Sequence, residues 1–256
     1  MELWYAGADK RPLSSTQTEP PIQPRILVFH TMAGYLRGTD SWFRRDGFDG
    51  VESHFGVGGS SDQPEDDGRV FQWQALDRQA DAQANGNSLA TSVETSDGGD
   101  SAQPWSRLQL ASLVGLTVWW AGQTGNPIVL ATGPKGRGIG YHSQFSEWNP
   151  SRHACPGRVR LSQLLTRVLP TAQAIQAGGV HPETRPALRR VLRSQQPMLQ
   201  GADVAMVQNL VRVKPDGWYG PDTVRAVKSF QKARGLVSDG IVGPTTATAL
   251  GLLWLG

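Results

Sequence analysis

The segment Arg25-Ile-Leu-Val-Phe-His30 decides how the larger part of this chain folds. Its continuous apolar run is typical of a β-strand that is covered on both faces. In open sheets covered by helices, functional groups gather at the carboxyl ends of the strands, so His30 is a candidate site residue. A buried histidine whose ring nitrogens are satisfied by backbone groups is the other interpretation, and position alone does not exclude it.

Further elements follow this strand in an order that predicts an α/β fold. Short apolar and β-branched segments predict three more strands, and apolar periodicity predicts two covering helices, the first opening near Pro104 and stopping at Gly125-Asn-Pro127. We expect at least one of Trp119 and Trp120 to lie in the core, because adjacent helical residues point in different directions. The expected strands are residues 53–58, 68–73 and 88–94, and the expected helices are residues 104–124 and 159–169.

The chain has 256 residues, 38% of them hydrophobic, enough for one large domain or for a large and a small one. Residues 176–256 hold ten Lys/Arg and five Asp/Glu, whereas residues 1–175 hold 15 and 17. A cationic C-terminal part favours an anionic partner, but charge alone does not choose among nucleic acid, acidic lipid and other anionic polymers. The single cysteine excludes an intrachain disulfide.

The segment Gly138–Gly157 gathers several groups that bind metals. It holds His142, His153 and Cys155 among glycines and prolines that can keep a loop in a fixed, non-repetitive geometry. A tetrahedral zinc site with an open fourth position needs three protein ligands, and histidine with cysteine is a usual set. The pattern therefore suggests a metal.

The last sixty residues contain an internal repeat. Asp216-Gly-Trp-Tyr-Gly-Pro-Asp-Thr223 is echoed by Asp239-Gly-Ile-Val-Gly-Pro-Thr-Thr246, twenty-three positions later. Asp-Gly favours a tight turn, and proline favours the first turn of a helix, so each copy predicts a turn followed by a helix. With a preceding helix they form a small three-helix module, whose expected packing residues are Val204, Val207, Leu210, Val224, Val227, Phe230, Ala249 and Leu250.

This tail resembles the common peptidoglycan-binding domain of wall hydrolases, in which a helix precedes two turn-helix units of the form D-G-x-x-G-P-x-T. The resemblance covers about residues 195–252 and includes Phe230-Gln231 and Gly235-Leu236. It implies a wall-binding module. A compact helical bundle without such a function is the alternative.

The front part looks like the zinc-dependent N-acetylmuramoyl-L-alanine amidases, the family that includes phage-lysozyme-type amidases and peptidoglycan recognition proteins. Four segments carry the resemblance: the strand ending in His30, Ser53-His-Phe55, Ser92-Val-Glu94, and Gly140-Tyr-His142 leading to His153-Ala-Cys-Pro-Gly157. It implies a central mixed β-sheet flanked by helices, Zn2+ as cofactor, and His30, His142 and Cys155 as the zinc ligands.

The resemblance also implies two catalytic residues. His153 stands where the family has a lysine that steadies the developing oxyanion, so we interpret it as a transition-state stabiliser rather than as a zinc ligand. Glu94 matches the carboxylate that assists the zinc-bound water, and Ser53 stands where related amidases have a tyrosine for this task. A solvated strand-end glutamate is the alternative for Glu94.

Two segments depart from the family pattern. The substrate loop of the family often has a His-Ala pair where this chain has Gln79-Ala-Asp-Ala-Gln83, which puts contacts with the stem peptide in doubt but not the metal. The insertion Gln144–Arg152 is longer than in the simplest members, and its Phe145 and Trp148 either contact glycan or pack internally.

These features predict an enzyme that cuts the amide between N-acetylmuramic acid and L-alanine. The expected organisation is a catalytic domain over residues 1–175, a linker over 176–194 and a peptidoglycan-binding domain over 195–256. Two rivals are a non-catalytic peptidoglycan-recognition protein and a cysteine peptidase with Cys155 as nucleophile.

The expected partner is bacterial peptidoglycan, with no nucleic acid, no stable membrane insertion and a monomeric state. Met1–Lys10 shows no cleavable signal peptide, and no run of eighteen apolar residues predicts a membrane span. Action at the bacterial cell wall would then require either a phage or prophage lysin released through the membrane or a non-standard export route.

Overall fold

The chain forms two compact units, residues 1–184 and 185–256. A computed structural model describes residues 2–14, 18–46, 48, 50–178, 187–250 and 252–254. Each unit has its own hydrophobic core. Leu188 and Leu192 lie in the core of the second unit, so the stretch predicted as a linker over residues 176–194 contributes to that unit. Residues 179–186 of that stretch lie outside the described residues.

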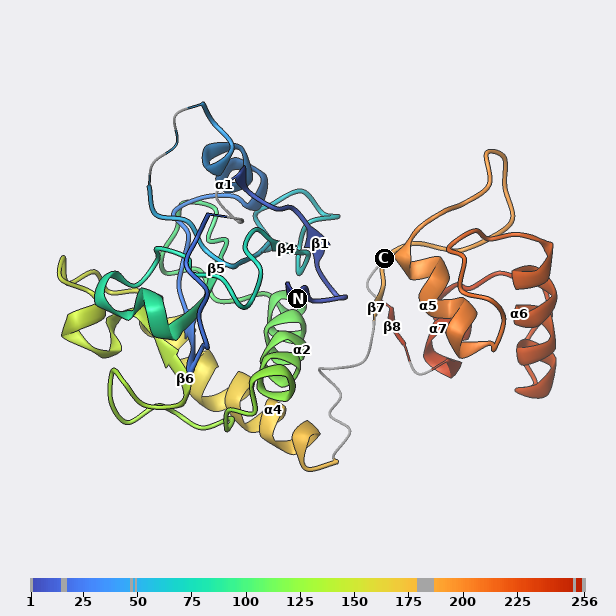
Figure 1. Ribbon diagram of the computed structural model, residues 1–256. Helices are drawn as coiled ribbons and strands as arrows, with labels where there is room; N and C mark the ends of the chain where they lie inside the picture. Colours follow the sequence, from blue (N-terminus) through green and yellow to red (C-terminus); the bar gives the residue numbers. More distant parts are fainter. Residues whose placement is uncertain are drawn as a thin grey trace. The chain divides into compact units, whose positions relative to one another are not determined.

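A six-stranded sheet with the order β1-β4-β3-β5-β2-β6 forms the centre of the first unit (Figure 1). Only the β3–β4 pair is antiparallel, and the other neighbours run parallel. This confirms the predicted α/β class with a mixed central sheet. The strands are β1 (Asp9–Lys10), β2 (Ile26–Phe29), β3 (Phe55–Val57), β4 (Val70–Gln72), β5 (Ala90–Thr95) and β6 (Gly138–Tyr141).

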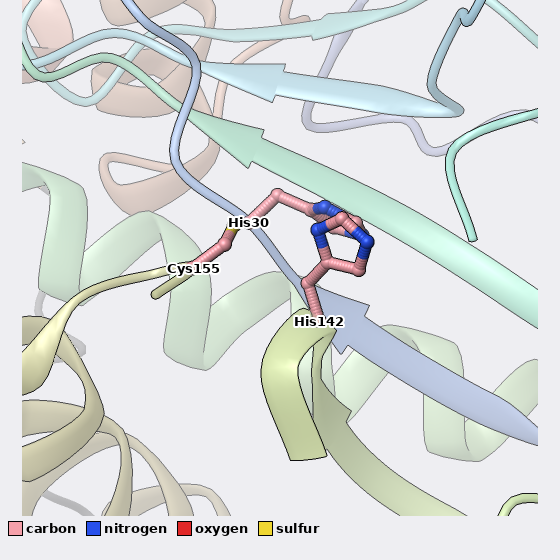
Figure 2. Close-up of side chains that lie close together, drawn as sticks. All are labelled: His30, His142 and Cys155. Carbon is pink, nitrogen blue, oxygen red and sulfur yellow. The ribbon is translucent and has the colours of Figure 1, made fainter. Parts of the chain in front are cut away.

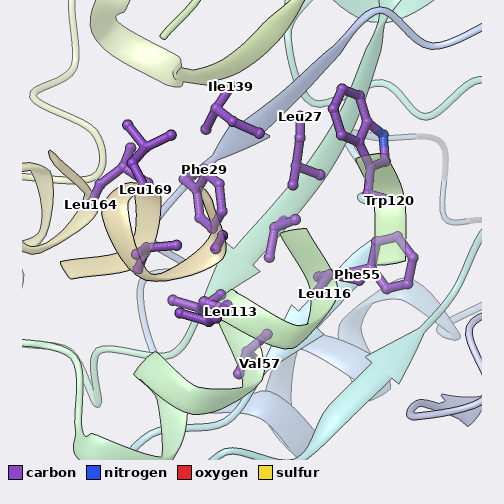
Figure 3. Close-up of a cluster of buried hydrophobic side chains, with 14 of the residues drawn as sticks. Leu27, Phe29, Phe55, Val57, Leu113, Leu116, Trp120, Ile139, Leu164 and Leu169 are labelled. Atoms are coloured by element: carbon purple, nitrogen blue, oxygen red, sulfur yellow. The ribbon is translucent and has the colours of Figure 1, made fainter. Parts of the chain in front are cut away.

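Strand β2 is fully buried because both of its faces are covered. Leu27 and Phe29 point into the main core, while Ile26 and Val28 point into a smaller cluster on the other face. The main core packs the sheet against α2 (Arg107–Thr124) and α4 (Leu169–Gln176), which also contact each other (Figures 1 and 3). A continuous apolar strand is the sequence that such two-sided cover requires.

Helix α2 starts three residues later than Pro104 suggested. Ser106 is the N-cap and forms a capping box with Gln109, so Pro104 lies before the helix. Gly125 ends it in the left-handed region at φ 65°, as its glycine predicted. Trp120 is buried and Trp119 packs at the edge of the core, which confirms the expectation that at least one of them is core.

The other helices of the first unit are α1 (Leu36–Phe43), which lies between β2 and β3 in the sequence, and a long helix that follows β6. The predicted helix over residues 159–169 is part of a longer one, in which α3 (Arg158–Gln163) continues through a π-helical turn at Leu164–Val168 into α4. Helix α1 packs through Leu36 and Phe43 on a separate apolar cluster. Short 3-10 helices occur at Ala84–Leu89, His142–Gln144 and Ser146–Trp148. In the described part of the chain, no helix combines the length and apolar character needed to cross a bilayer.

The second unit contains the three predicted helices, α5 (Ala202–Leu210), α6 (Pro221–Ala233) and α7 (Pro244–Ala249). Leu210, expected in the core, is 41% exposed at the end of α5. Strand β7 (Ala187–Leu188) lies in the stretch predicted as a linker and pairs with β8 (Leu253–Trp254).

A buried glutamine explains why the repeat has a period of twenty-three residues. The amide of Gln208 donates to Asp216, Trp218 and Thr223 and accepts from Gly217 N–H, so one side chain holds the whole Asp-Gly turn. Gln231 makes the same four contacts in the second copy, to Asp239, Ile241, Thr246 and Gly240.

We expect Gln231→Met to lower the free energy of unfolding of the second unit by about 1–3 kcal/mol, the cost of leaving a buried polar group unpaired. Methionine fills similar volume but offers no amide. Urea titration of the full chain, followed by hydrogen exchange of the Gly240 amide, measures the change. The adjacent exposed substitution Lys232→Met is the control and should stay within about 0.5 kcal/mol. Equal effects of the two substitutions would contradict the role of Gln231.

Candidate metal centre

Strand register brings three of the predicted site residues to one edge of the sheet. Phe29 of β2 pairs with Val93 of β5 on one side and with Tyr141 of β6 on the other, all in parallel. The next residue along each strand is His30, Glu94 and His142 respectively. Parallel strands end at the same edge, so these side chains leave the sheet together.

Cys155 comes to this edge from the loop that follows His142. Ser143 donates both its backbone N–H and its hydroxyl to the carbonyl of Cys155, at 3.0 and 2.8 Å. The N–H of Thr31 donates to the sulfur at 3.3 Å. One candidate ligand atom from each of His30, His142 and Cys155 lies within 4.8 Å of the others (Figure 2).

Hydrogen bonds orient both imidazoles. Nε2 of His142 lies 2.9 Å from the carbonyl oxygen of Trp148, which can only accept, so this nitrogen carries the proton and Nδ1 keeps its lone pair. Nε2 of His30 lies 2.5 Å from the side-chain amide of Gln83. Nδ1 of His30 lies 3.7 Å from Oε1 of Glu94.

Burial keeps both imidazoles neutral. It lowers the pKa of His30 well below the usual value, and the neighbouring His142 lowers it further. Burial also lowers the pKa of His142, against the opposing effect of the Trp148 carbonyl, and His153 adds to the lowering. Neutral imidazole is the form that binds metals.

The two acidic groups of the site have raised pKa values. Burial, with a contribution from Asp97, raises the pKa of Glu94 to about 8. Burial, with a contribution from Glu94, raises the pKa of the Cys155 thiol to about 12. Oε2 of Glu94 is buried and has no hydrogen-bond partner. A cation placed among these groups would favour their ionised forms and thereby offset the cost of burial.

A buried arginine forms hydrogen bonds with the residues at this edge of the sheet. Arg160 of α3 is fully buried and donates to the carbonyls of Gln103, Thr95 and Ser96 and to the hydroxyls of Thr31 and Thr95. These contacts fix the residues that directly follow His30 and Glu94. The guanidinium also lowers the pKa of Cys155 and of Glu94, against the larger effect of burial.

His153 lies on the exposed part of the same loop. Asn149 holds its backbone by accepting from its N–H and donating to its carbonyl. His153 lowers the pKa of His142, and its catalytic role remains a prediction.

The aromatic residues of the insertion pack internally. Trp148 is 1% exposed, and Phe145 packs against it edge to face with ring centroids 4.5 Å apart. The alternative in which Trp148 contacts glycan is therefore wrong. His54, in a segment that carried the family resemblance, is buried away from the cluster, with its ring nitrogens near Ser92 Oγ and the Arg78 carbonyl.

Sequence reasoning missed two residues of the site. Gln83 was noticed only as the end of a departing segment, and its contact with His30 depends on how that loop packs. Arg160 had no signal in the sequence, because its spacing in α3 resembles that of any exposed basic residue.

Comparisons with known proteins assign the second unit more directly than the first. Residues 200–250 match the family model described as "Putative peptidoglycan binding domain". A curated relative from Bacillus licheniformis, named "Probable N-acetylmuramoyl-L-alanine amidase", is 48% identical over 52 residues, which are 20% of this chain and 15% of that protein. The match thus spans only a small part of that relative.

Solved structures similar to the chain include one named as a hydrolase and one named as an amidase. The hydrolase AmiA of Staphylococcus aureus has a TM-score of 0.49 at 16% identity, covering 70% of this chain and 89% of its own. The N-acetylmuramoyl-L-alanine amidase LysC of Clostridium intestinale has a TM-score of 0.44 at 13% identity, covering 67% and 99%. At such low similarity, the function of the first unit has to be argued from its own residues, while the second unit matches a peptidoglycan-binding family over most of its length.

Proposed function

We propose that the chain is a zinc-dependent N-acetylmuramoyl-L-alanine amidase that acts on bacterial peptidoglycan at the cell wall. The observation that carries the proposal is the convergence of His30, His142 and Cys155 within 4.8 Å at the end of the central strands, beside the carboxylate of Glu94. Two neutral imidazoles and a cysteine sulfur supply three ligands, and a catalytic zinc site keeps its fourth coordination position open for water or substrate.

The residues fit zinc in spacing as well as in chemistry. Ligand atoms around a tetrahedral zinc ion are separated by roughly 3.3–3.8 Å, so small side-chain rotations suffice. His142 offers Nδ1, since Nε2 is held by the Trp148 carbonyl. If the Gln83 amide presents its oxygen to Nε2 of His30, that imidazole also offers Nδ1, and Gln83 acts as the outer partner that metal-bound histidines usually have. Bound zinc would lower the pKa of a water toward neutrality and polarise the substrate carbonyl.

Glu94 is the candidate general base. Its Oε2 is buried without a partner and its pKa is raised, both of which suit a group that takes a proton and then releases it. It would take the proton of the attacking water and pass it to the leaving amine of L-alanine. His153 would donate a hydrogen bond to the developing oxyanion from the exposed side of the loop.

The second unit would hold the enzyme on its insoluble substrate. It matches a peptidoglycan-binding family model over residues 200–250. A tether to a repetitive surface raises the local concentration of the attached domain without changing its chemistry.

The cysteine-peptidase alternative is disfavoured by electrostatics. A nucleophilic thiol requires a lowered pKa, whereas burial raises that of Cys155 to about 12. The non-catalytic recognition alternative differs from the proposal in its products, and digestion of peptidoglycan distinguishes the two.

We expect purified protein to hold one zinc ion per chain and to release new L-alanine amino termini from peptidoglycan. His142→Gln and Cys155→Ser should lose zinc, because each removes one of three ligands. His153→Gln is the matched control: it should keep zinc and lower kcat. Metal analysis and mass spectrometry of the digest are the measurements. If His153→Gln loses zinc while His142→Gln retains it, the ligand assignment is wrong, and if wall digestion survives chelation, so is the metal mechanism.

We expect Glu94→Gln to lower kcat by about 10²–10⁴-fold, the usual contribution of a general base, while zinc content stays at one per chain. Because the ionised carboxylate is the base, kcat/KM should fall as pH drops through the pKa of Glu94, which burial raises and a bound cation lowers. Glu94→Gln should abolish that fall. Glu147→Gln, an exposed carboxylate of the nearby 3-10 helix, is the control. An unchanged pH profile in Glu94→Gln would remove Glu94 from this role.

We expect deletion of residues 179–256 to leave zinc binding intact and to weaken activity on whole cell walls more than on soluble fragments. The reason is that the first unit has a separate core and holds all the candidate ligands. Metal analysis and parallel assays on walls and on soluble muropeptides measure the two effects. Loss of zinc from the shortened chain would contradict the division into independent units.

A further inference from the structure

Three carboxylates lie together at a second place in the first unit. One carboxylate oxygen from each of Glu19, Glu52 and Asp81 lies within 4.8 Å of the others. They come from three separate segments: the leader before β2, the residues before β3 and the loop after β4. A cavity of about 400 Å³ adjoins them.

Glu52 is the most buried member of the cluster, and one of its carboxylate oxygens has no hydrogen-bond partner. The residue is 4% exposed, and its Oε1 is buried without a hydrogen-bond partner. Its carboxylate also accepts a hydrogen bond from Gln74. A buried carboxylate oxygen left without a partner costs free energy unless a ligand satisfies it.

The neighbouring basic residues contact groups other than the three carboxylates, and Nε of Arg78 is buried without a partner. Arg44 donates to Asp40 and to the carbonyls of Pro12 and Arg11, and Arg45 stacks on Trp42. Arg78 donates to the carbonyl of Glu19, not to its carboxylate. No ion pair joins any of the three acids to an arginine or lysine within the described ranges.

Like charges in this cluster oppose one another. Burial raises the pKa of Glu52 to about 7, and Asp81 and Glu19 raise it further. Burial and Asp81 also raise the pKa of Glu19. A cation among the three would reverse the sign of these interactions.

We propose that Glu19, Glu52 and Asp81 form a binding site for a hard divalent cation, of which Ca2+ fits best. Calcium takes oxygen ligands at about 2.3–2.6 Å, so ligand oxygens on opposite sides of the ion are up to about 5 Å apart, and the observed cluster falls within that span. Magnesium demands a tighter octahedron, and zinc prefers nitrogen and sulfur. The adjoining cavity leaves room for the waters that complete the shell.

This cation site is connected to the imidazole of His30 by a short series of hydrogen bonds. Oδ1 of Asp81 accepts from Asn87 Nδ2 at 2.8 Å, and Oδ1 of Asn87 accepts from the backbone N–H of Gln83 at 2.7 Å. The side chain of Gln83 then contacts His30. An ion held by Asp81 would therefore steady the loop that positions Gln83.

The test is a calcium titration of the full chain, freed of other metals and reloaded with one equivalent of zinc. Isothermal titration calorimetry should detect one calcium site per chain, and added calcium should raise the Tm. Glu52→Gln should weaken calcium binding at least tenfold and abolish the rise in Tm, because it keeps the shape but removes a ligand charge. Asp81→Asn should act in the same direction. Glu65→Gln, an exposed carboxylate outside the cluster, should match the unsubstituted chain.

Two results would overturn the proposal: no calcium uptake by the unsubstituted chain, or equal uptake by Glu52→Gln and Glu65→Gln. The Tm in the absence of calcium, measured on each sample, verifies that the variants are folded. Calcium uptake is read independently of wall digestion, so failure of the amidase proposal would leave this result unchanged.

Discussion

The candidate active site depends on the register of three parallel strands. Once Phe29 pairs with both Val93 and Tyr141, the next residue of every strand must emerge at the same edge, and those residues are His30, Glu94 and His142. A shift of one residue in either pairing would turn its functional side chain to the other face of the sheet. Apolar packing on both faces of β2 holds this register. The same strand pairing therefore determines both the packing of the core and the position of the candidate site residues.

Arg160 places a positive charge close to the site where a metal cation would bind. Its buried guanidinium ties the ends of β2 and β5 to α3 through four hydrogen bonds, and a fifth goes to the carbonyl of Gln103. Burial lowers the pKa of Arg160, and the nearby carboxylates oppose that lowering. A second cation at the histidines would lie near this positive charge. The thiol of Cys155 and the carboxyl of Glu94 interact electrostatically with Arg160 and can compensate both positive groups by ionising.

Sequence predicted the parts of this protein that follow from local patterns. Continuous apolar strands predicted where His30 and Glu94 stand, and the Asp-Gly repeat predicted the turns of the second unit. The sequence did not predict the partners that arise from packing between distant segments, such as Gln208 over its turn, Gln83 against His30 or Glu52 beside Asp81. A polar side chain in a loop carries no periodic signal, so only the folded chain shows whether it faces water or another residue.

Mutation can disturb the orientation of one imidazole of the site more easily than that of the other. Nε2 of His142 is held by a main-chain atom, the carbonyl of Trp148, which every possible residue at that position also possesses. Nε2 of His30 is held by a side chain, which a single codon change at Gln83 can remove. Across natural variation, the first contact can persist while the insertion around it drifts in sequence. The second can persist only where selection maintains an amide, or an equivalent polar group, at position 83.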